Sequence, residues 1–103
     1  MIRHLVALRF KDGTSSKTKY RLYAELAGLK DRIEGILDFQ ARPNVSVEDP
    51  LVRGYRDLFW FDFRDEAVRD AYLADEVHQA IGARIVEELH DGAEGVFVFD
   101  FEV

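Results

Sequence analysis

The chain has 103 residues, a formal net charge of -6, 48% hydrophobic residues and no cysteine. Its size and apolar share predict one folded domain, placed at residues 1–103. The acidic balance argues against nucleic acid as a partner, and the lack of cysteine excludes a disulfide, a thiolate metal site and a cysteine nucleophile.

The first third of the chain predicts a strand followed by a helix. Apolar residues alternate over residues 2–10, and His4 shares one face of this strand with Val6 and Leu8. Residues 15–33 predict a helix because apolar side chains recur there at helical spacing, at Leu22, Leu26, Leu29 and Ile33.

Two further strands are predicted, joined by a loop over residues 46–54. The first covers residues 36–45 and carries Leu37, Phe39 and Ala41 on one face. The second covers residues 55–63 and has large apolar groups on both faces, because its phenylalanines alternate with Leu58 and Trp60.

A second helical region and a last strand complete the chain. Residues 66–89 predict a helix that breaks near Asp75, with inward positions at Val68, Ala71, Tyr72, Ile81, Ile85 and Leu89. Residues 96–103 predict a strand, in which Phe97, Phe99 and Phe101 alternate with Val98 and Asp100.

The order strand, helix, strand, strand, helix, strand predicts an α+β fold of the ferredoxin-like type. Right-handed crossovers fold this order into a four-stranded antiparallel sheet with both helices on one face. The third and last strands carry bulky apolar groups on both faces, so the uncovered face would expose a large apolar patch. We therefore expect a homodimer that packs sheet face against sheet face, which gives a dimeric α/β barrel.

Four segments resemble the stress-responsive A/B barrel family: residues 4–11, Gly54 with Tyr55, residues 72–79 and residues 98–101. They span essentially the whole chain and occur in the family's order. The resemblance implies a dimeric α/β barrel with ferredoxin-like protomers. The family includes plant stress proteins, polyketide cyclases such as olivetolic acid cyclase, and bacterial proteins without an assigned role.

The resemblance also implies a pocket. Of four residues that line the pocket of the cyclase, three match His4, Tyr72 and His78 here, while the position of a third-strand histidine is Asp57. We expect His78, Tyr72 and Asp57 to be catalytic and His4 to bind substrate. For each of them a purely structural role is the alternative.

The chemistry of these residue types suits acid–base catalysis. An imidazole such as that of His78 titrates near neutral pH and can take a proton from a ligand, and the phenol of Tyr72 can donate a hydrogen bond to an oxyanion. The two residues are six positions apart, so they face one pocket only if the helix breaks near Asp75. Asp57, if it reaches His78, would orient its ring as an acid–base dyad.

Two functions remain open at this point: a small-molecule cyclase or isomerase that uses His78 and Tyr72, and a noncatalytic ligand-binding or stress-related structural homodimer. A cofactor-independent monooxygenase of the same fold is a third. The sequence contains no set of metal ligands and no cofactor-binding motif, so we expect neither a bound metal nor a cofactor. We see no signal peptide or membrane span, which together with the absence of cysteine predicts a cytoplasmic protein.

Overall fold

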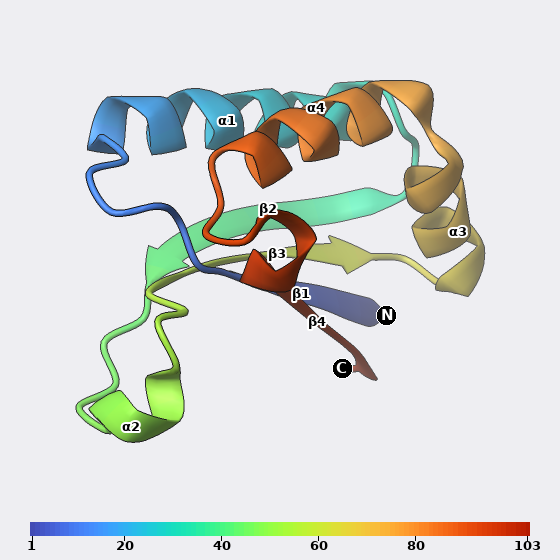
Figure 1. Cartoon of the computed structure of the whole chain (residues 1–103). Helices are drawn as coiled ribbons and strands as arrows, with labels where there is room; N and C mark the ends of the chain where they lie inside the picture. The colour runs from blue at the N-terminus through green and yellow to red at the C-terminus, as the bar shows by residue number, and fades with distance from the viewer.

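The computed structural model describes residues 1–103, with a four-stranded sheet covered on one face by helices (Figure 1). In chain order the elements are β1 (Ile2–Leu8), α1 (Ser16–Gly28), the 3₁₀ turn η1 (Leu29–Asp31), β2 (Ile36–Pro43), α2 (Asp49–Val52), β3 (Asp57–Phe63), α3 (Glu66–Ala74), α4 (Glu76–Glu87), the 3₁₀ turn η2 (Gly92–Gly95) and β4 (Val96–Glu102). The strand order is β2-β3-β1-β4, and all neighbours are antiparallel. The predicted ferredoxin-like arrangement is therefore confirmed.

The core lies between the sheet and the helices. Every second residue of β1, from Ile2 to Leu8, is buried, and the phenylalanines of β3 at positions 59, 61 and 63 lie beside them. The predicted inward positions of residues 15–33 are buried too, at Leu22, Leu26, Leu29 and Ile33. Among the predicted inward positions of the second helical region, only Ala71 is exposed.

The opposite face of the sheet has no helix over it. β4 is an edge strand, and its outward side chains Phe97, Phe99 and Phe101 are 51%, 51% and 46% exposed. In the register of β1 and β4, Phe99 lies opposite Leu5. A row of half-exposed aromatic residues on an uncovered sheet face is a surface suited to a partner.

The break near Asp75 is confirmed. Asp75 is extended, with φ −70° and ψ 126°, and it both ends α3 and caps the start of α4. Its carboxylate accepts a hydrogen bond of 2.9 Å from the backbone N–H of His78. This cap satisfies one of the donors that a helix start leaves without a partner, so the chain can begin a second helix in a new direction.

Element boundaries differ from the prediction where the chain turns. The predicted loop 46–54 contains the short helix α2, and β3 begins at residue 57 rather than 55. A bulge between Ile36 and Asp38 turns Leu37 outward, so its predicted place beside Phe39 and Ala41 is wrong. Gly35 precedes the bulge with φ 98°, where a side chain would also collide with Val68.

Candidate functional site

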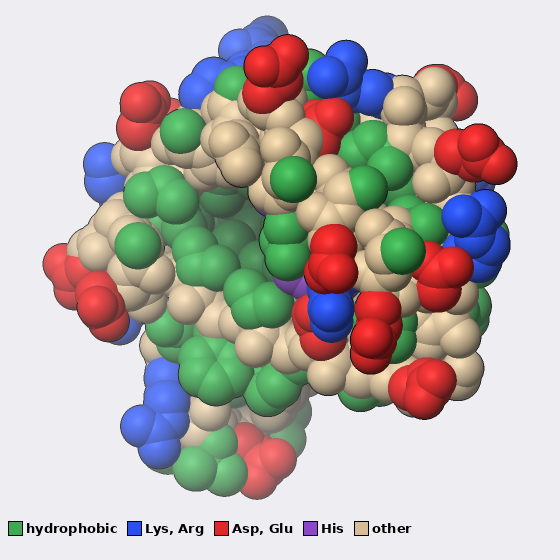
Figure 2. Space-filling view, turned by 90° about the vertical axis from the view of Figure 1, so that its right-hand side faces the viewer, with side chains coloured by type: hydrophobic (Ala, Val, Ile, Leu, Met, Phe, Trp, Pro, Cys, Tyr) green, Lys and Arg blue, Asp and Glu red, His purple; other side chains and the backbone are tan.

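A cavity of about 340 Å³ lies between the helix-facing side of β1 and β4 and the helices α3 and α4. Ten of its fourteen lining residues are hydrophobic. Figure 2 shows one face of the molecule on which hydrophobic side chains gather around a hollow. Three of the side chains with polar groups in this wall carry a ring, His4, Tyr72 and His78, and Gln79 is the fourth polar side chain. A mostly apolar cavity with a few polar groups is the usual form of a small-molecule site.

Tyr72 and His78 come from different helices and meet in the cavity wall. Tyr72 lies near the end of α3, and His78 lies in the first turn of α4, positioned by the Asp75 cap. Their ring centroids are 3.8 Å apart with an angle of 32° between the planes. The break in the helix therefore brings Tyr72 and His78 to one pocket, although they are six residues apart in the sequence.

The environment keeps His78 neutral. Burial holds the pKa of His78 below its ordinary value of 6.5, and the nearby ring of His4 lowers it further. The backbone of Tyr72 and the carboxylate of Asp75 act in the opposite direction, with smaller effects. A histidine with a lowered pKa is an unprotonated imidazole at pH 7, which can accept a proton.

Tyr72 is held in its protonated form. Burial raises the pKa of its phenol, so the hydroxyl remains a hydrogen-bond donor across the physiological pH range. The ring packs against Phe61 and Phe63 of β3, with centroids 4.8 and 5.0 Å away. This packing fixes the phenol in the cavity wall.

His4 completes the set from the sheet. Its ring centroid is 5.5 Å from that of Tyr72, and its Nδ1 lies 2.7 Å from a carboxylate oxygen of Asp100 on the neighbouring strand β4. Because a carboxylate only accepts, the Nδ1 of His4 carries the proton of this hydrogen bond. The second carboxylate oxygen of Asp100 accepts from Arg69 at 3.2 Å.

The profile of the stress-responsive A/B barrel domain, known as Dabb, matches residues 2–103. This chain belongs to the Dabb family. The family suggested by the sequence is therefore confirmed. No curated protein matches the chain.

Solved structures agree with this assignment. A dimeric ferredoxin-like protein of unknown function from a Jannaschia species is 31% identical, over 99% of this chain and 98% of that chain, with a TM-score of 0.87. A protein of Arabidopsis thaliana is 26% identical over 100% of this chain and 95% of that chain, also with a TM-score of 0.87. A hydroxynitrile lyase from Passiflora edulis shares the fold, with 14% identity over 99% and 92% of the two chains and a TM-score of 0.80.

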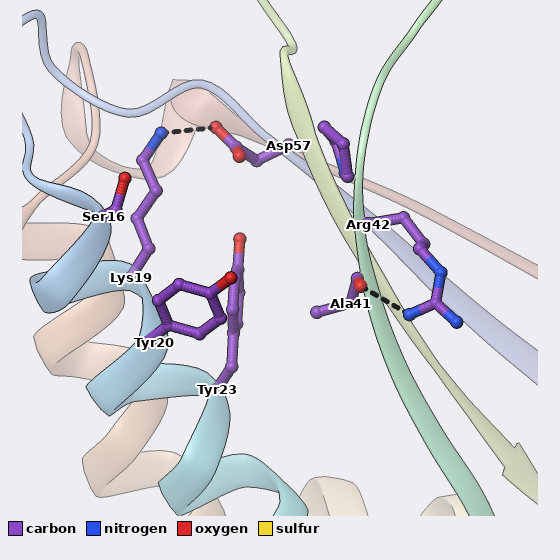
Figure 3. Close-up of a pocket in the computed structure, with 8 residues that line it drawn as sticks. Ser16, Lys19, Tyr20, Tyr23, Ala41, Arg42 and Asp57 are labelled. Atoms are coloured by element: carbon purple, nitrogen blue, oxygen red, sulfur yellow. Dashed lines mark hydrogen bonds and ion pairs between the residues drawn. The ribbon is translucent and has the colours of Figure 1, made fainter.

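In this Dabb chain Asp57 lies outside the cavity. It is paired with Leu8 at the opposite end of β1 from His4, and its carboxylate accepts a hydrogen bond of 2.9 Å from the Nζ of Lys19 on α1. It lines a second cavity instead (Figure 3). The predicted dyad of Asp57 and His78 is therefore wrong, because the strand register separates the two side chains.

Sequence reasoning missed Asp100 and Arg69 as parts of the site. Asp100 shares a strand face with Val96 and Val98, which line the cavity. A carboxylate beside apolar side chains needs a polar partner, so the sequence did carry a signal for one. Only the pairing of β1 with β4 shows that this partner is His4. No cluster of three or more histidine, aspartate or glutamate side chains is suited to hold a metal ion.

Proposed function

We propose that this Dabb protein is an acid–base enzyme that moves a proton on a small, mostly apolar carbonyl compound, as in a polyketide-type cyclisation or an isomerisation. The observation that carries the proposal is the contact between the neutral imidazole of His78 and the protonated phenol of Tyr72 in one apolar cavity. A base and a hydrogen-bond donor side by side are the two groups that enolate chemistry needs.

The steps follow from these two side chains. His78 takes a proton from the carbon beside the substrate carbonyl, and the electron pair of that C–H bond moves onto the carbonyl oxygen. Tyr72 donates a hydrogen bond to this oxygen as its negative charge develops. The imidazolium of His78 then returns the proton to a different carbon in an isomerisation, or to the new alkoxide after an intramolecular C–C bond forms in a cyclisation.

We assign substrate binding to His4. Since Asp100 orients the ring through Nδ1, the Nε2 of His4 is left to contact a hydroxyl or enol oxygen of the substrate. Arg69 keeps Asp100 in place by binding its other oxygen. His4 is buried, so its ring has a fixed orientation in the cavity wall.

The alternative is a noncatalytic, ligand-binding or structural homodimer. The half-exposed phenylalanines of β4 and the dimeric state of the Jannaschia protein support a dimer, which this alternative shares with the catalytic form. We propose that both forms of the function use a dimer joined through the uncovered sheet faces. The hydroxynitrile lyase from Passiflora edulis shows only that an enzyme can be built on this fold.

The catalytic form is tested with benzylacetone, a single-ring ketone with exchangeable protons beside its carbonyl. In heavy water the protein should accelerate the exchange of these protons for deuterium, measured by proton NMR. A His78→Ala variant should lose about 100-fold or more of this acceleration, the typical share of a general base. His90→Ala, which changes an exposed histidine, is the matched control. Exchange no faster than in buffer would favour the noncatalytic alternative.

None of the helices has the length and apolar character needed to span a bilayer. A cytoplasmic location remains our proposal, supported by the absence of cysteine.

A further inference from the structure

A second cavity, of about 260 Å³, lies between α1 and the ends of β2 and β3. It shares no lining residue with the cavity of His78. Figure 3 shows Tyr20 and Tyr23 projecting from α1 into the space beside the strands, with the Lys19–Asp57 pair along one side. The proposed acid–base chemistry uses none of these residues.

The polar wall of this cavity has no net charge. Lys19 and Asp57 form an ion pair of 2.9 Å, and their side chains are only 26% and 16% exposed. Arg42 also lines the cavity, but its guanidinium points away from Tyr20 and Tyr23 (Figure 3). It lies 5.9 Å from the ring centroid of Trp60 on the uncovered face. An uncharged ligand therefore fits this wall better than an ion, which would compete with one member of the pair.

Two polar groups in the wall are left for a ligand. The hydroxyl of Tyr23 is buried and has no hydrogen-bond partner within the chain. Burial, together with the negative charge of Asp57, raises the pKa of Tyr23, so this hydroxyl is a donor. The bond from Lys19 uses Oδ2 of Asp57, which leaves Oδ1 as an acceptor. A buried polar group without a partner costs free energy that a ligand recovers.

We propose that this cavity binds a small uncharged aromatic molecule with a hydroxyl group, such as a phenol. Its hydroxyl oxygen accepts from Tyr23 and its proton is donated to Asp57. Its ring lies against the rings of Tyr20 and Tyr23 and against Pro43. The cavity volume is just below the ~300–1,000 Å³ typical of sites for drug-sized ligands, which sets the size at a single ring.

The experiment is a titration of the ¹⁵N-labelled protein with phenol, followed by NMR. The backbone signals of Ser16, Tyr23 and Ala41 should shift in a saturable manner, and those of His78 should not. Benzoate and benzylamine, which have the same ring with a charged group, should bind more weakly than phenol.

Tyr23→Phe is the decisive variant, because it removes only the unpartnered hydroxyl and should leave the fold intact. It should weaken phenol binding about five- to tenfold, the usual effect of one lost hydrogen bond. Asp57→Asn should also weaken binding. Tyr55→Phe, which alters a phenol that donates to the Glu94 carbonyl outside this cavity, should not. His78→Ala should bind phenol like the wild type, which separates this result from the proposed catalysis.

Four results would overturn the proposal. The first is phenol-induced shifts confined to the surroundings of His78. The second is equal affinity of phenol for the wild type and the Tyr23→Phe variant. The third is tighter binding of benzoate or benzylamine than of phenol. The fourth is no saturable binding of phenol.

Discussion

The ring of His78 lies against the ring of Tyr72, with centroids 3.8 Å apart, although six residues separate them in the chain. On one continuous helix a spacing of six residues turns the side chains roughly 120° apart, at about 100° per residue. The extended residue Asp75 removes this restriction by ending α3 and starting α4. The contact between the candidate base His78 and the candidate hydrogen-bond donor Tyr72 therefore depends on the extended backbone conformation of Asp75.

The pKa of His78 should lie below 6.5, because burial and the neighbouring His4 both disfavour the imidazolium. A His4→Gln substitution removes the second effect and keeps a polar side chain, so it should raise the pKa of His78 toward its ordinary value. Titration of the imidazole signals by NMR measures both values. An unchanged pKa of His78 in the variant would show that the two rings do not interact.

Asp75 should control both the start of α4 and the position of His78. Asp75→Ala removes the cap and the ion pair with Arg32, so the melting temperature should fall by several degrees. Asp75→Asn is the matched control, because asparagine also caps helices; it should keep most of the stability and lower the pKa of His78 slightly. Circular dichroism measures the melting temperature and NMR measures the pKa of His78. Equal melting temperatures for Asp75→Ala and the wild type would contradict the role of the cap.

The same residue gives a pH dependence. Hydrogen bonds from the His78 backbone and from Arg32 hold the pKa of Asp75 below its ordinary value of 3.8. The stabilisation is therefore fully present above the unfolded pKa and is lost as the pH falls through the folded pKa. Thermal unfolding of the wild type and of Asp75→Asn between neutral and acidic pH should converge at the acidic end. Parallel curves over the whole range would contradict this.

Asp100→Leu should release His4. The variant removes the oxygen that accepts from Nδ1, so the ring is no longer fixed in one tautomer and the protein should lose about 1–2 kcal/mol of stability. Nitrogen NMR of the imidazole reports the tautomer directly. Asp70→Leu is the control, because Asp70 also binds Arg69 but has no contact with His4. A single Nδ1-protonated tautomer of His4 in Asp100→Leu would contradict the assignment.

Phe99→Asp should produce a monomer. The charge would lie on the uncovered sheet face, opposite Leu5, where a second copy would have to bury it. Ala24→Asp, at an exposed position of α1, is the control and should leave the subunit number unchanged. Native mass spectrometry measures both; a Phe99→Asp dimer would place the interface elsewhere.

The alternation and helical spacing of apolar residues were enough to predict the order of the elements and most of the core. Leu26 and Ile85 are buried as predicted because their positions repeat every three to four residues along a helix face. Ala71 is exposed because Val68 and Tyr72, four residues apart, already define the buried face of the short helix α3. The bulge that turns Leu37 outward depends on pairing with β3, which local sequence does not specify.

The candidate site shows the same limit. The alternation of β3 correctly placed Asp57 on the helix side with Phe59, but the distance of Asp57 from His78 depends on the register between β1 and β3. The partnership of Asp100 with His4 likewise requires the register between β1 and β4. Side-chain direction is a property of the local sequence, whereas the neighbour across a sheet is a property of the whole fold.

The most direct test of the central claim is the pH dependence of benzylacetone proton exchange. If neutral His78 is the base, the rate should rise with pH to a plateau, with a midpoint below 6.5 that equals the pKa of His78 measured by NMR. The rise should be absent in His78→Ala. A rate that does not depend on pH, or a rise with the same midpoint in the His78→Ala variant, would contradict the account.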